Sequence, residues 1–314
     1  MECLEKLEGE RIVNFHGILS GVFVDKQLGG GIGMRDDKLV SNSDRHVVRD
    51  FGLEWEKFDQ KELEDKELEN AFDQYFHLFP FDTLGNDAVG FDMGCGSGRW
   101  AKFVAPRVGK LNLVDASPVA LQQAKSNLAT LPNVSFECAS VEDASLEPHS
   151  QDFGYCLGVL HHLPDTAEGL RSCSKFLKPG APFLLYLYYN FENKPRWFRA
   201  LWKVSDVMRR TLSKLPFRLK AFVAEVIAVT VYWPLSRLAK ALEKFGRDVT
   251  NLPLADYRDK SFYFLRTDAL DRFGTRLERR FSRAEIEAML VDSGFMDIRF
   301  SDRTPHWVAL ARKA

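Results

Sequence analysis

The amino-acid sequence predicts an α/β protein built on a doubly wound, mostly parallel sheet of seven strands with a helical insertion. Three observations support this fold class. From residue 88 to residue 190, strand-like runs alternate with helix-like runs, as in a parallel sheet covered by helices on both faces. A glycine-rich stretch, FDMGCGSGRW at 91–100, stands between the first strand and the first helix of this region. The alternation breaks at residue 191 and resumes at residue 282.

The elements are expected in the following order, each from its apolar periodicity and its turn residues. An acidic amphipathic helix is expected over 54–73, EWEKFDQKELEDKELENAFD. Strands are expected at 88–93, 111–116, 134–139, 152–160, 182–189, 296–302 and 306–312. Helices are expected at 97–108, 118–129, 166–177 and 282–295.

These elements divide the chain into four parts: an N-terminal extension with the acidic helix (1–80), a core (81–190), a basic and aromatic helical cap insertion (191–262) and the rest of the core (263–314). Within the extension, the glycines of QLGGGIGMRDDK (27–38) indicate a flexible loop. A phosphate cradle is disfavoured there because no Lys-Ser or Lys-Thr pair follows.

Composition indicates an ordinary globular protein. The 314 residues carry a formal net charge of -1 and are 45% hydrophobic, so no global charge attracts nucleic acid or an anionic membrane. The five cysteines lack CxxC spacing, which argues against a disulfide framework and against a metal site. The charged N-terminus, MECLEKLEGE, contains no apolar signal core, so we expect a cytoplasmic protein.

The insertion allows three interpretations. Its residues 191–244 hold twelve Lys and Arg against four Asp and Glu, interleaved with aromatic residues. A lid over the substrate ranks first, peripheral membrane contact second and nucleic-acid binding third. The apolar run AFVAEVIAVTVYWPLS (221–236) contains Glu225 and Pro234 and is too short for a typical membrane span, so we expect a buried or interfacial helix there.

The glycine-rich loop indicates a ribose-bearing cofactor. Gly94, Gly96 and Gly98 are spaced two apart, but Arg99 stands where a dinucleotide fingerprint requires glycine, and no P-loop pattern is present. Asp115 ends the next strand about twenty residues later, where a carboxylate can accept hydrogen bonds from ribose hydroxyls.

Together with three further features, this loop resembles the class I S-adenosylmethionine-dependent methyltransferases. The features are Asp115, GVLHHLPD at 158–165 and LKPG at 177–180. The resemblance covers 88–190 and resumes at 282–312. More narrowly, FGLEWEKF at 51–58 and the long insertion are similar to the bacterial "type 11" group, many of which modify sugars or small metabolites. The resemblance implies a Rossmann-like sheet whose last strand is antiparallel.

The resemblance also implies roles for individual residues. Asp92 faces the ammonium of S-adenosylmethionine, Asp115 takes the ribose hydroxyls, and the loop after the third strand flanks the adenine. Ser140 departs from the aspartate that many relatives place there, so either its hydroxyl or Glu142 makes that contact. The residues expected to bind the cofactor are Asp92, Gly94, Gly96, Gly98, Asp115, Ala116, Ser140, Val141 and Gly158.

The reaction is expected at the rim of the sheet where His161 and His162 follow the fourth strand. His161 is the candidate base or substrate orienter, because histidine suits removal of a hydroxyl proton near pH 7; the alternative is that the pair only packs the loop. We expect methyl transfer to a hydroxyl of a small polar or sugar-derived acceptor, while O-, N- and C-methylation all stay open.

Other interpretations of the function are a non-catalytic partner subunit that binds the cofactor and a nicotinamide-dependent oxidoreductase, which Arg99 opposes. Further along, Arg276, Arg279 and Arg280 could reach an acidic acceptor, but the favoured expectation is that they are exposed beside Ser282, a helix N-cap.

Overall fold

The computed structural model describes residues 42–58 and 65–314, and the loop expected at 27–38 lies outside them. The described residues form the seven-stranded sheet that the sequence predicts, in the order β3-β2-β1-β4-β5-β7-β6. The strands are β1 (Val89–Met93), β2 (Lys110–Asp115), β3 (Val134–Cys138), β4 (Phe153–Leu157), β5 (Pro182–Tyr186), β6 (Phe295–Phe300) and β7 (Val308–Lys313).

The first five strands are parallel, and β7 runs antiparallel to both of its neighbours, β5 and β6. Strand order therefore reverses between β1 and β4, because β2 and β3 lie on one side of β1 and β4 and β5 on the other. A ligand of an open α/β sheet binds beyond the carboxyl ends of the strands at such a switch point. The glycine-rich loop leaves β1 at this place.

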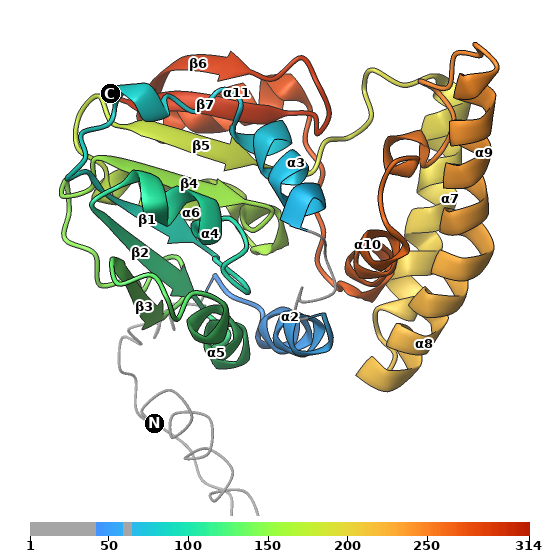
Figure 1. Cartoon of the computed structure of the whole chain (residues 1–314), viewed down its shortest axis with the longest axis horizontal. Helices are drawn as coiled ribbons and strands as arrows, with labels where there is room; N and C mark the ends of the chain where they lie inside the picture. Colours follow the sequence, from blue (N-terminus) through green and yellow to red (C-terminus); the bar gives the residue numbers. More distant parts are fainter. Residues whose placement is uncertain (1–41, 59–64) are drawn as a thin grey trace, which may run out of the picture. The chain divides into compact units, whose positions relative to one another are not determined.

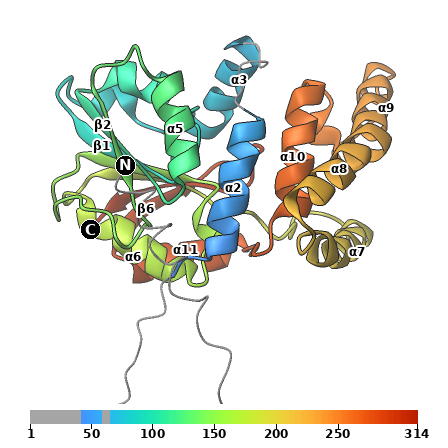
Figure 2. The same ribbon diagram turned by 90° about the horizontal axis from the view of Figure 1, so that it is seen from below.

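Helices cover both faces of the sheet (Figures 1 and 2). On one face, the cluster that includes Phe72, Trp100 and Leu121 packs α3 (Asp65–Phe76), α4 (Ala101–Val104) and α5 (Pro118–Asn127) against the strands. On the other face, the cluster that includes Leu170 and Leu290 packs α6 (Thr166–Phe176) and α11 (Arg283–Asp292).

Polar side chains cap three of these helices at their N-termini. The side chains of Ser117, Asp165 and Ser282 accept hydrogen bonds from the first-turn amides of α5, α6 and α11. These caps explain why the helices start where local sequence signals predict.

The prediction of one acidic helix over 54–73 is wrong. A first helix, α2 (Arg45–Lys57), ends before Phe58, and the second, α3, begins at Asp65. Phe58 leaves helical geometry and buries its ring in a cluster with Ala221 and Leu270. The periodicity of a charged sequence does not reveal that one of its phenylalanines turns to a distant helix.

The insertion is helical. It contains α7 (Arg196–Leu212), α8 (Phe217–Ile227), a π-helical turn (Ala228–Tyr232) and α9 (Trp233–Lys244). From α8 to α9 the helix is continuous, and in the described residues it is the one helix long and apolar enough to cross a membrane by length and composition. Helix α10 (Phe262–Gly274), which falls almost entirely in the part of the chain expected to complete the core (263–314), packs against α7 and α8 on one side and α2 on the other (Figure 2).

Candidate active site

The loop after β1 depends on glycine at all three spaced positions. Gly94, Gly96 and Gly98 have φ angles of 77°, 54° and 77°, a region that other L-residues seldom adopt. A Cβ on Gly94 would stand 2.4 Å from Val159, and one on Gly96 would stand 2.9 Å from the Trp55 indole. The chain therefore passes closely between neighbouring side chains here, and Gly98 packs on α5 instead of lining the cavity.

Asp115 closes this loop against the end of β2. One carboxylate oxygen accepts a hydrogen bond from the Gly96 amide and the other from the Ser117 amide, both at 2.8 Å. Burial raises the pKa of Asp115, and the two amides lower it in part. Since a carboxylate oxygen has two lone pairs, each oxygen can still accept a hydrogen bond from the cavity that Asp115 lines.

Asp92 lies beneath the loop, is nearly fully buried, and is not among the residues that line the cavity. Its Oδ2 atom has no hydrogen-bond partner in the described part of the chain. Burial raises the pKa of Asp92 to about 8, although the neighbouring Tyr155 hydroxyl lowers it, and the Asp115 carboxylate raises it further. An unpartnered buried carboxylate oxygen would be stabilised by a cationic group placed above it.

Four other residues expected to bind the cofactor line the cavity: Ala116, Ser140, Val141 and Gly158. The Ser140 hydroxyl donates to Asp143 at 2.7 Å, which leaves its lone pairs free to accept. Gly158 has a φ of 79°, and no atom of the described residues lies within 4 Å of the place where its Cβ would stand.

These features fit S-adenosylmethionine. The loop brings backbone close to the cavity, Asp115 offers acceptors for a ribose diol, and Gly158 leaves open the space that a Cβ would fill. Arg99, the residue that breaks the dinucleotide fingerprint, lies with its guanidinium over the Trp100 ring at 4.6 Å and the Trp55 ring at 5.3 Å. In the described residues, no group of three or more His, Cys, Asp or Glu side chains is arranged to hold a metal ion.

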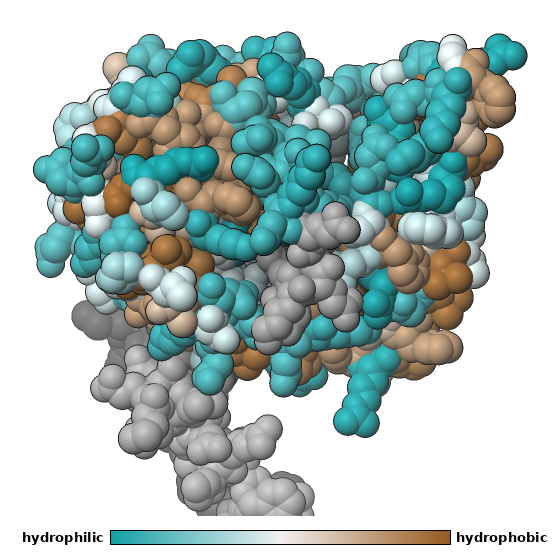
Figure 3. Space-filling model, viewed as in Figure 1, coloured by the Kyte–Doolittle hydropathy of each residue, from teal (hydrophilic) through white to brown (hydrophobic). Residues whose placement is uncertain are grey.

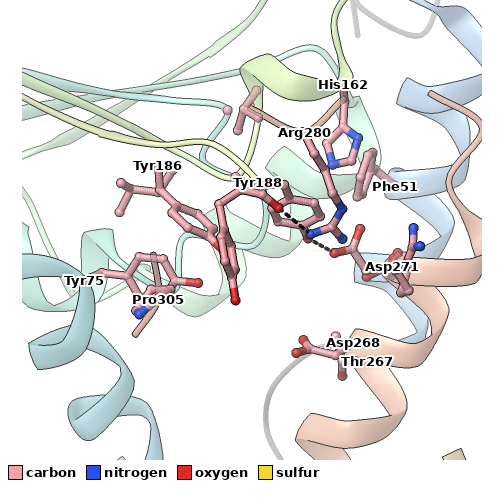
Figure 4. A pocket seen from close by; sticks show the side chains of 18 of the residues that line it. Phe51, Tyr75, His162, Tyr186, Tyr188, Thr267, Asp268, Asp271, Arg280 and Pro305 are labelled. Atoms are coloured by element: carbon pink, nitrogen blue, oxygen red, sulfur yellow. Dashed lines mark hydrogen bonds between the residues drawn. The ribbon is translucent and has the colours of Figure 1, made fainter. Parts of the chain in front are cut away.

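The cavity, of about 670 Å³, continues from this region to the cap. The half of the cavity next to the cap is lined by aromatic side chains. They come from α3, from the end of β5 and the residues that follow it up to 191, from α7 and from the segment 232–264. They are Tyr75, Tyr186, Tyr188, Tyr189, Phe191, Phe198, Trp202, Tyr232, Tyr257 and Phe264. Polar groups enter this aromatic half from α10, and Figure 4 shows Asp268 and Asp271 on the side of α10 that faces Tyr188.

Tyr188 connects β5 with α10. Its hydroxyl donates a short hydrogen bond to Asp271, and its ring stacks on His161 with 3.9 Å between centroids. Burial, followed by the Asp271 carboxylate, raises the pKa of Tyr188. The phenol therefore stays protonated near neutral pH and orients Asp271 without acting as a base.

Asp268 lies three residues before Asp271 on the same side of α10 (Figure 4). Burial raises its pKa to about 6, the Tyr257 hydroxyl lowers it, and the Asp271 carboxylate raises it. A carboxylate whose pKa lies near the working pH can accept a proton and release it again.

The two histidines follow β4 at the rim of the sheet, as expected, but only His162 lines the cavity. His161 is fully buried and does not line the cavity, and neither of its ring nitrogens has a hydrogen-bond partner among residues 42–58 and 65–314. Burial and the neighbouring His162 hold the pKa of His161 well below its ordinary value. His162 lines the cavity, with Nδ1 2.7 Å from the Leu277 carbonyl oxygen. The two rings lie in contact within the turn at 160–162, with 4.0 Å between centroids, yet His161 stays behind the cavity wall that His162 forms.

The expectation that all three late arginines are exposed is wrong for Arg280. Only 12% of its side chain is exposed, it pairs with Glu278 at 2.8 Å, and its guanidinium lies 4.9 Å from the Tyr188 ring centroid. Arg276 and Arg279 are exposed. Sequence reasoning also missed Tyr188, Asp268 and Asp271. The available signals were the place of Tyr188 near the carboxyl end of the strand expected at 182–189 and the three-residue spacing of the two aspartates.

Comparison with known proteins agrees with this geometry. Residues 91–180 match a family model described as "Methyltransferase domain". Similar curated proteins include the ubiquinone biosynthesis O-methyltransferase of Neisseria meningitidis, 26% identical over 184 residues, which are 57% of this chain and 72% of that protein. The protein of the same name from Xanthomonas campestris is 32% identical over 134 residues, covering 42% of this chain and 55% of its own.

Among solved structures, similar chains include the 1,6-didemethyltoxoflavin-N1-methyltransferase of Burkholderia thailandensis, with S-adenosylhomocysteine bound. It is 15% identical, with a TM-score of 0.47, and the match covers 86% of this chain and 88% of that one. The matching domain model, the strand order and the glycine-rich loop together show that the chain contains a methyltransferase domain on a Rossmann-like sheet, with S-adenosylmethionine as its cofactor.

Proposed function

We propose that this methyltransferase acts on the oxygen of a small aromatic acceptor, a phenol or catechol, held between the sheet and the cap. The observation that carries the proposal is the half of the cavity next to the cap, where tyrosine, phenylalanine and tryptophan rings surround a few acidic groups. Flat aromatic ligands stack well between such rings. The names of the relatives from Neisseria and Xanthomonas, which are O-methyltransferases, support the same reaction.

The roles that we propose for individual residues follow from their positions around the cavity. S-adenosylmethionine, when bound, supplies a methyl group already activated on a sulfonium, so much of the rate can come from holding the acceptor oxygen in line. We assign this holding to Tyr75, Tyr186 and Tyr188, whose rings border the cavity (Figure 4). Asp268 would accept the hydroxyl proton, and Asp271, held by Tyr188, would keep a second carboxylate beside it.

The cofactor contacts belong to the proposal as well. We assign Asp115, Ala116, Ser140, Val141 and Gly158 to direct contact, because they line the cavity. Asp92, which lies beneath the loop and does not line the cavity, is assigned to the cofactor's ammonium through a water on its unpartnered oxygen. The glycines Gly94, Gly96 and Gly98 shape the loop that presents these groups.

The test is a transfer assay with isotope-labelled S-adenosylmethionine and matched acceptors: catechol, aniline and a monosaccharide. We expect label on the catechol oxygen, with the product identified by mass spectrometry. Transfer only to the sugar would restore the polar or sugar-derived acceptor that the sequence suggests, and transfer only to aniline would make the enzyme an N-methyltransferase. Calorimetric binding of S-adenosylhomocysteine without transfer to any acceptor would favour the non-catalytic partner subunit.

A further inference from the structure

The outer surface of the cap is unusually apolar. In residues 42–58 and 65–314, sixteen large hydrophobic side chains are exposed, and thirteen of them lie between Trp197 and Phe245. Apolar residues gather along the right-hand edge of the molecule in Figure 3, over α8 and α9. An exposed apolar face of this kind marks an interaction surface rather than ordinary surface.

Helix α7 combines this apolar face with a row of bases. Trp197, Leu201, Val204 and Met208 are exposed and recur at spacings of four, three and four, so they lie on one side of the helix. The exposed bases Arg196, Arg199, Lys203 and Arg210 recur beside them. A third side, which includes Asp206 and Arg209, is buried against the protein.

The helix from α8 to α9 carries a second exposed apolar row. Phe222, Val226, Val229 and Trp233 are exposed at spacings of four, three and four. Its opposite side carries small residues, Ala221, Ala224 and Ala228, which are buried. This small-residue side packs on α10, so the apolar side is left facing outward.

This packing favours a helix that lies on a membrane over one that crosses it. Lys220 is buried and pairs with Asp50 of α2 at 2.6 Å, and Glu225 pairs with Arg266 of α10 at 2.7 Å. Insertion across a bilayer would break both ion pairs and expose them to hydrocarbon. A helix with one packed side, one apolar side and flanking bases matches an interfacial helix, whose apolar face enters the lipid headgroup boundary.

The apolar face also reaches the cavity. Leu201 and Val231 are exposed on the outer surface, and both line the cavity. The inner sides of α7 and of the helix through α9 supply further lining, Phe198, Trp202 and Leu235. An acceptor dissolved in a membrane would therefore meet the cavity wall directly at this surface.

We propose that the outer face of α7, α8 and α9 docks on an anionic lipid surface. The bases that border the apolar residues complement anionic headgroups, and exposed Trp197 and Trp233 suit the headgroup level. A second copy of the chain fits less well, because a two-fold contact would bring the same rows of bases toward each other. The proposal does not depend on the acceptor of the proposed function.

Vesicle flotation tests the proposal with the full chain. Vesicles of equimolar phosphatidylcholine and phosphatidylglycerol should carry the protein upward in low-salt buffer, and vesicles of phosphatidylcholine alone should carry much less. The variants Val204→Asp and Phe222→Asp change residues that are 62% and 65% exposed and do not line the cavity. Each should lower the partition coefficient about tenfold, and Arg199→Gln with Lys203→Gln should lower it about fivefold per charge removed.

The matched control is Val291→Asp on α11, which is 57% exposed and lies outside the cap; it should float like the parent chain. Calorimetric binding of S-adenosylhomocysteine to every variant checks that the core is folded. The proposal is overturned if the parent chain does not float with the anionic vesicles. It is also overturned if Val204→Asp and Val291→Asp reduce flotation equally. A dimer in light scattering that Val204→Asp dissociates, without vesicle binding, overturns it in favour of a second copy.

Discussion

At the scale of single residues, the protonation of Asp268 is expected to make the rate of methyl transfer depend on pH. Burial raises its pKa to about 6, while the Tyr257 hydroxyl lowers that pKa and the Asp271 carboxylate raises it, and only the carboxylate form can accept a proton. In the parent enzyme, kcat/KM should therefore fall about tenfold per pH unit below pH 6 and level off above it.

The change Asp268→Asn should remove this acidic limb and lower turnover about 100- to 1000-fold, because the amide accepts no proton. The measurement is kcat/KM between pH 5 and pH 8 with labelled methyl donor. The control is Asp256→Asn, another carboxylate that lines the cavity, which should keep the acidic limb. An unchanged rate and an unchanged limb in Asp268→Asn would exclude Asp268 as the base.

Substituting His161 tests whether a histidine at the rim of the sheet acts in catalysis. Its two ring nitrogens are buried and have no partner in the part of the chain that the structure describes, while its ring stacks on Tyr188. In His161→Phe the stacking is kept and two unpaired polar atoms are removed, and an unpaired buried polar atom costs about 1–3 kcal/mol.

We expect His161→Phe to keep turnover within about twofold and to leave the free energy of unfolding unchanged or higher. The comparison variant is His162→Phe, which loses the contact of Nδ1 with the Leu277 carbonyl and should be less stable. The measurements are steady-state turnover and urea unfolding. Collapsed turnover in His161→Phe with intact S-adenosylhomocysteine binding would return His161 to the role of base.

At the scale of elements, the connections between strands and helices carry the cofactor site. Gly158, after β4, and Gly180, before β5, both have positive φ angles and no atoms within 4 Å of the position a Cβ would occupy. Only Gly158 lines the cavity. Comparing alanine substitutions at Gly158 and Gly180 therefore distinguishes the effect of backbone strain from the effect of filling the cavity.

Both Gly158→Ala and Gly180→Ala should lose about 1–2 kcal/mol of unfolding free energy, because alanine is strained in the left-handed region. Only Gly158→Ala should also weaken S-adenosylhomocysteine binding, by tenfold or more, since its methyl group enters the cavity. Calorimetry measures the affinity for S-adenosylhomocysteine, and urea unfolding measures the free energy of unfolding. Equal affinities in the two variants would place the cofactor away from Gly158.

Element identity was largely predictable, because each strand or helix carries its own periodicity and its own terminal residues. The expected strand at 134–139 corresponds to Val134–Cys138, and the helix at 166–177 to Thr166–Phe176. The failures have non-local causes. The expected strand at 152–160 ends at Leu157, and the acidic helix is interrupted near Phe58, whose ring packs on a cap helix more than 160 residues away in the sequence.

At the scale of the whole molecule, the cap is joined to the N-terminal helices by a buried charge pair. Lys220 of α8 has a side chain only 2% exposed, and its Nζ lies 2.6 Å from Asp50 and 2.9 Å from the Gly274 carbonyl oxygen. Removing one partner of such a pair leaves an uncompensated buried charge, which costs about 3–5 kcal/mol.

We expect Lys220→Met to lower the free energy of unfolding by about 3–5 kcal/mol and the double variant with Asp50→Leu to recover much of the loss. The control is Lys240→Met, which breaks an exposed pair with Asp259 and should cost less than about 1 kcal/mol. Urea unfolding followed by tryptophan fluorescence measures all three. If Lys220→Met cost no more than Lys240→Met, the pair would not hold the cap.

The sequence by itself determined the sheet, the loop after β1 and the methyl donor. Strand and helix patterns are local, and the φ angles near 77° and 54° at Gly94 and Gly96 require glycine wherever the loop lies. Only the tertiary structure decided which side chains meet at the acceptor. Tyr188 and Asp271 are 83 residues apart and form one hydrogen bond, and His162 reaches the cavity while His161 does not. The same holds for the apolar outer face of the cap, because periodicity shows that a helix has two sides and packing alone decides which one stays exposed.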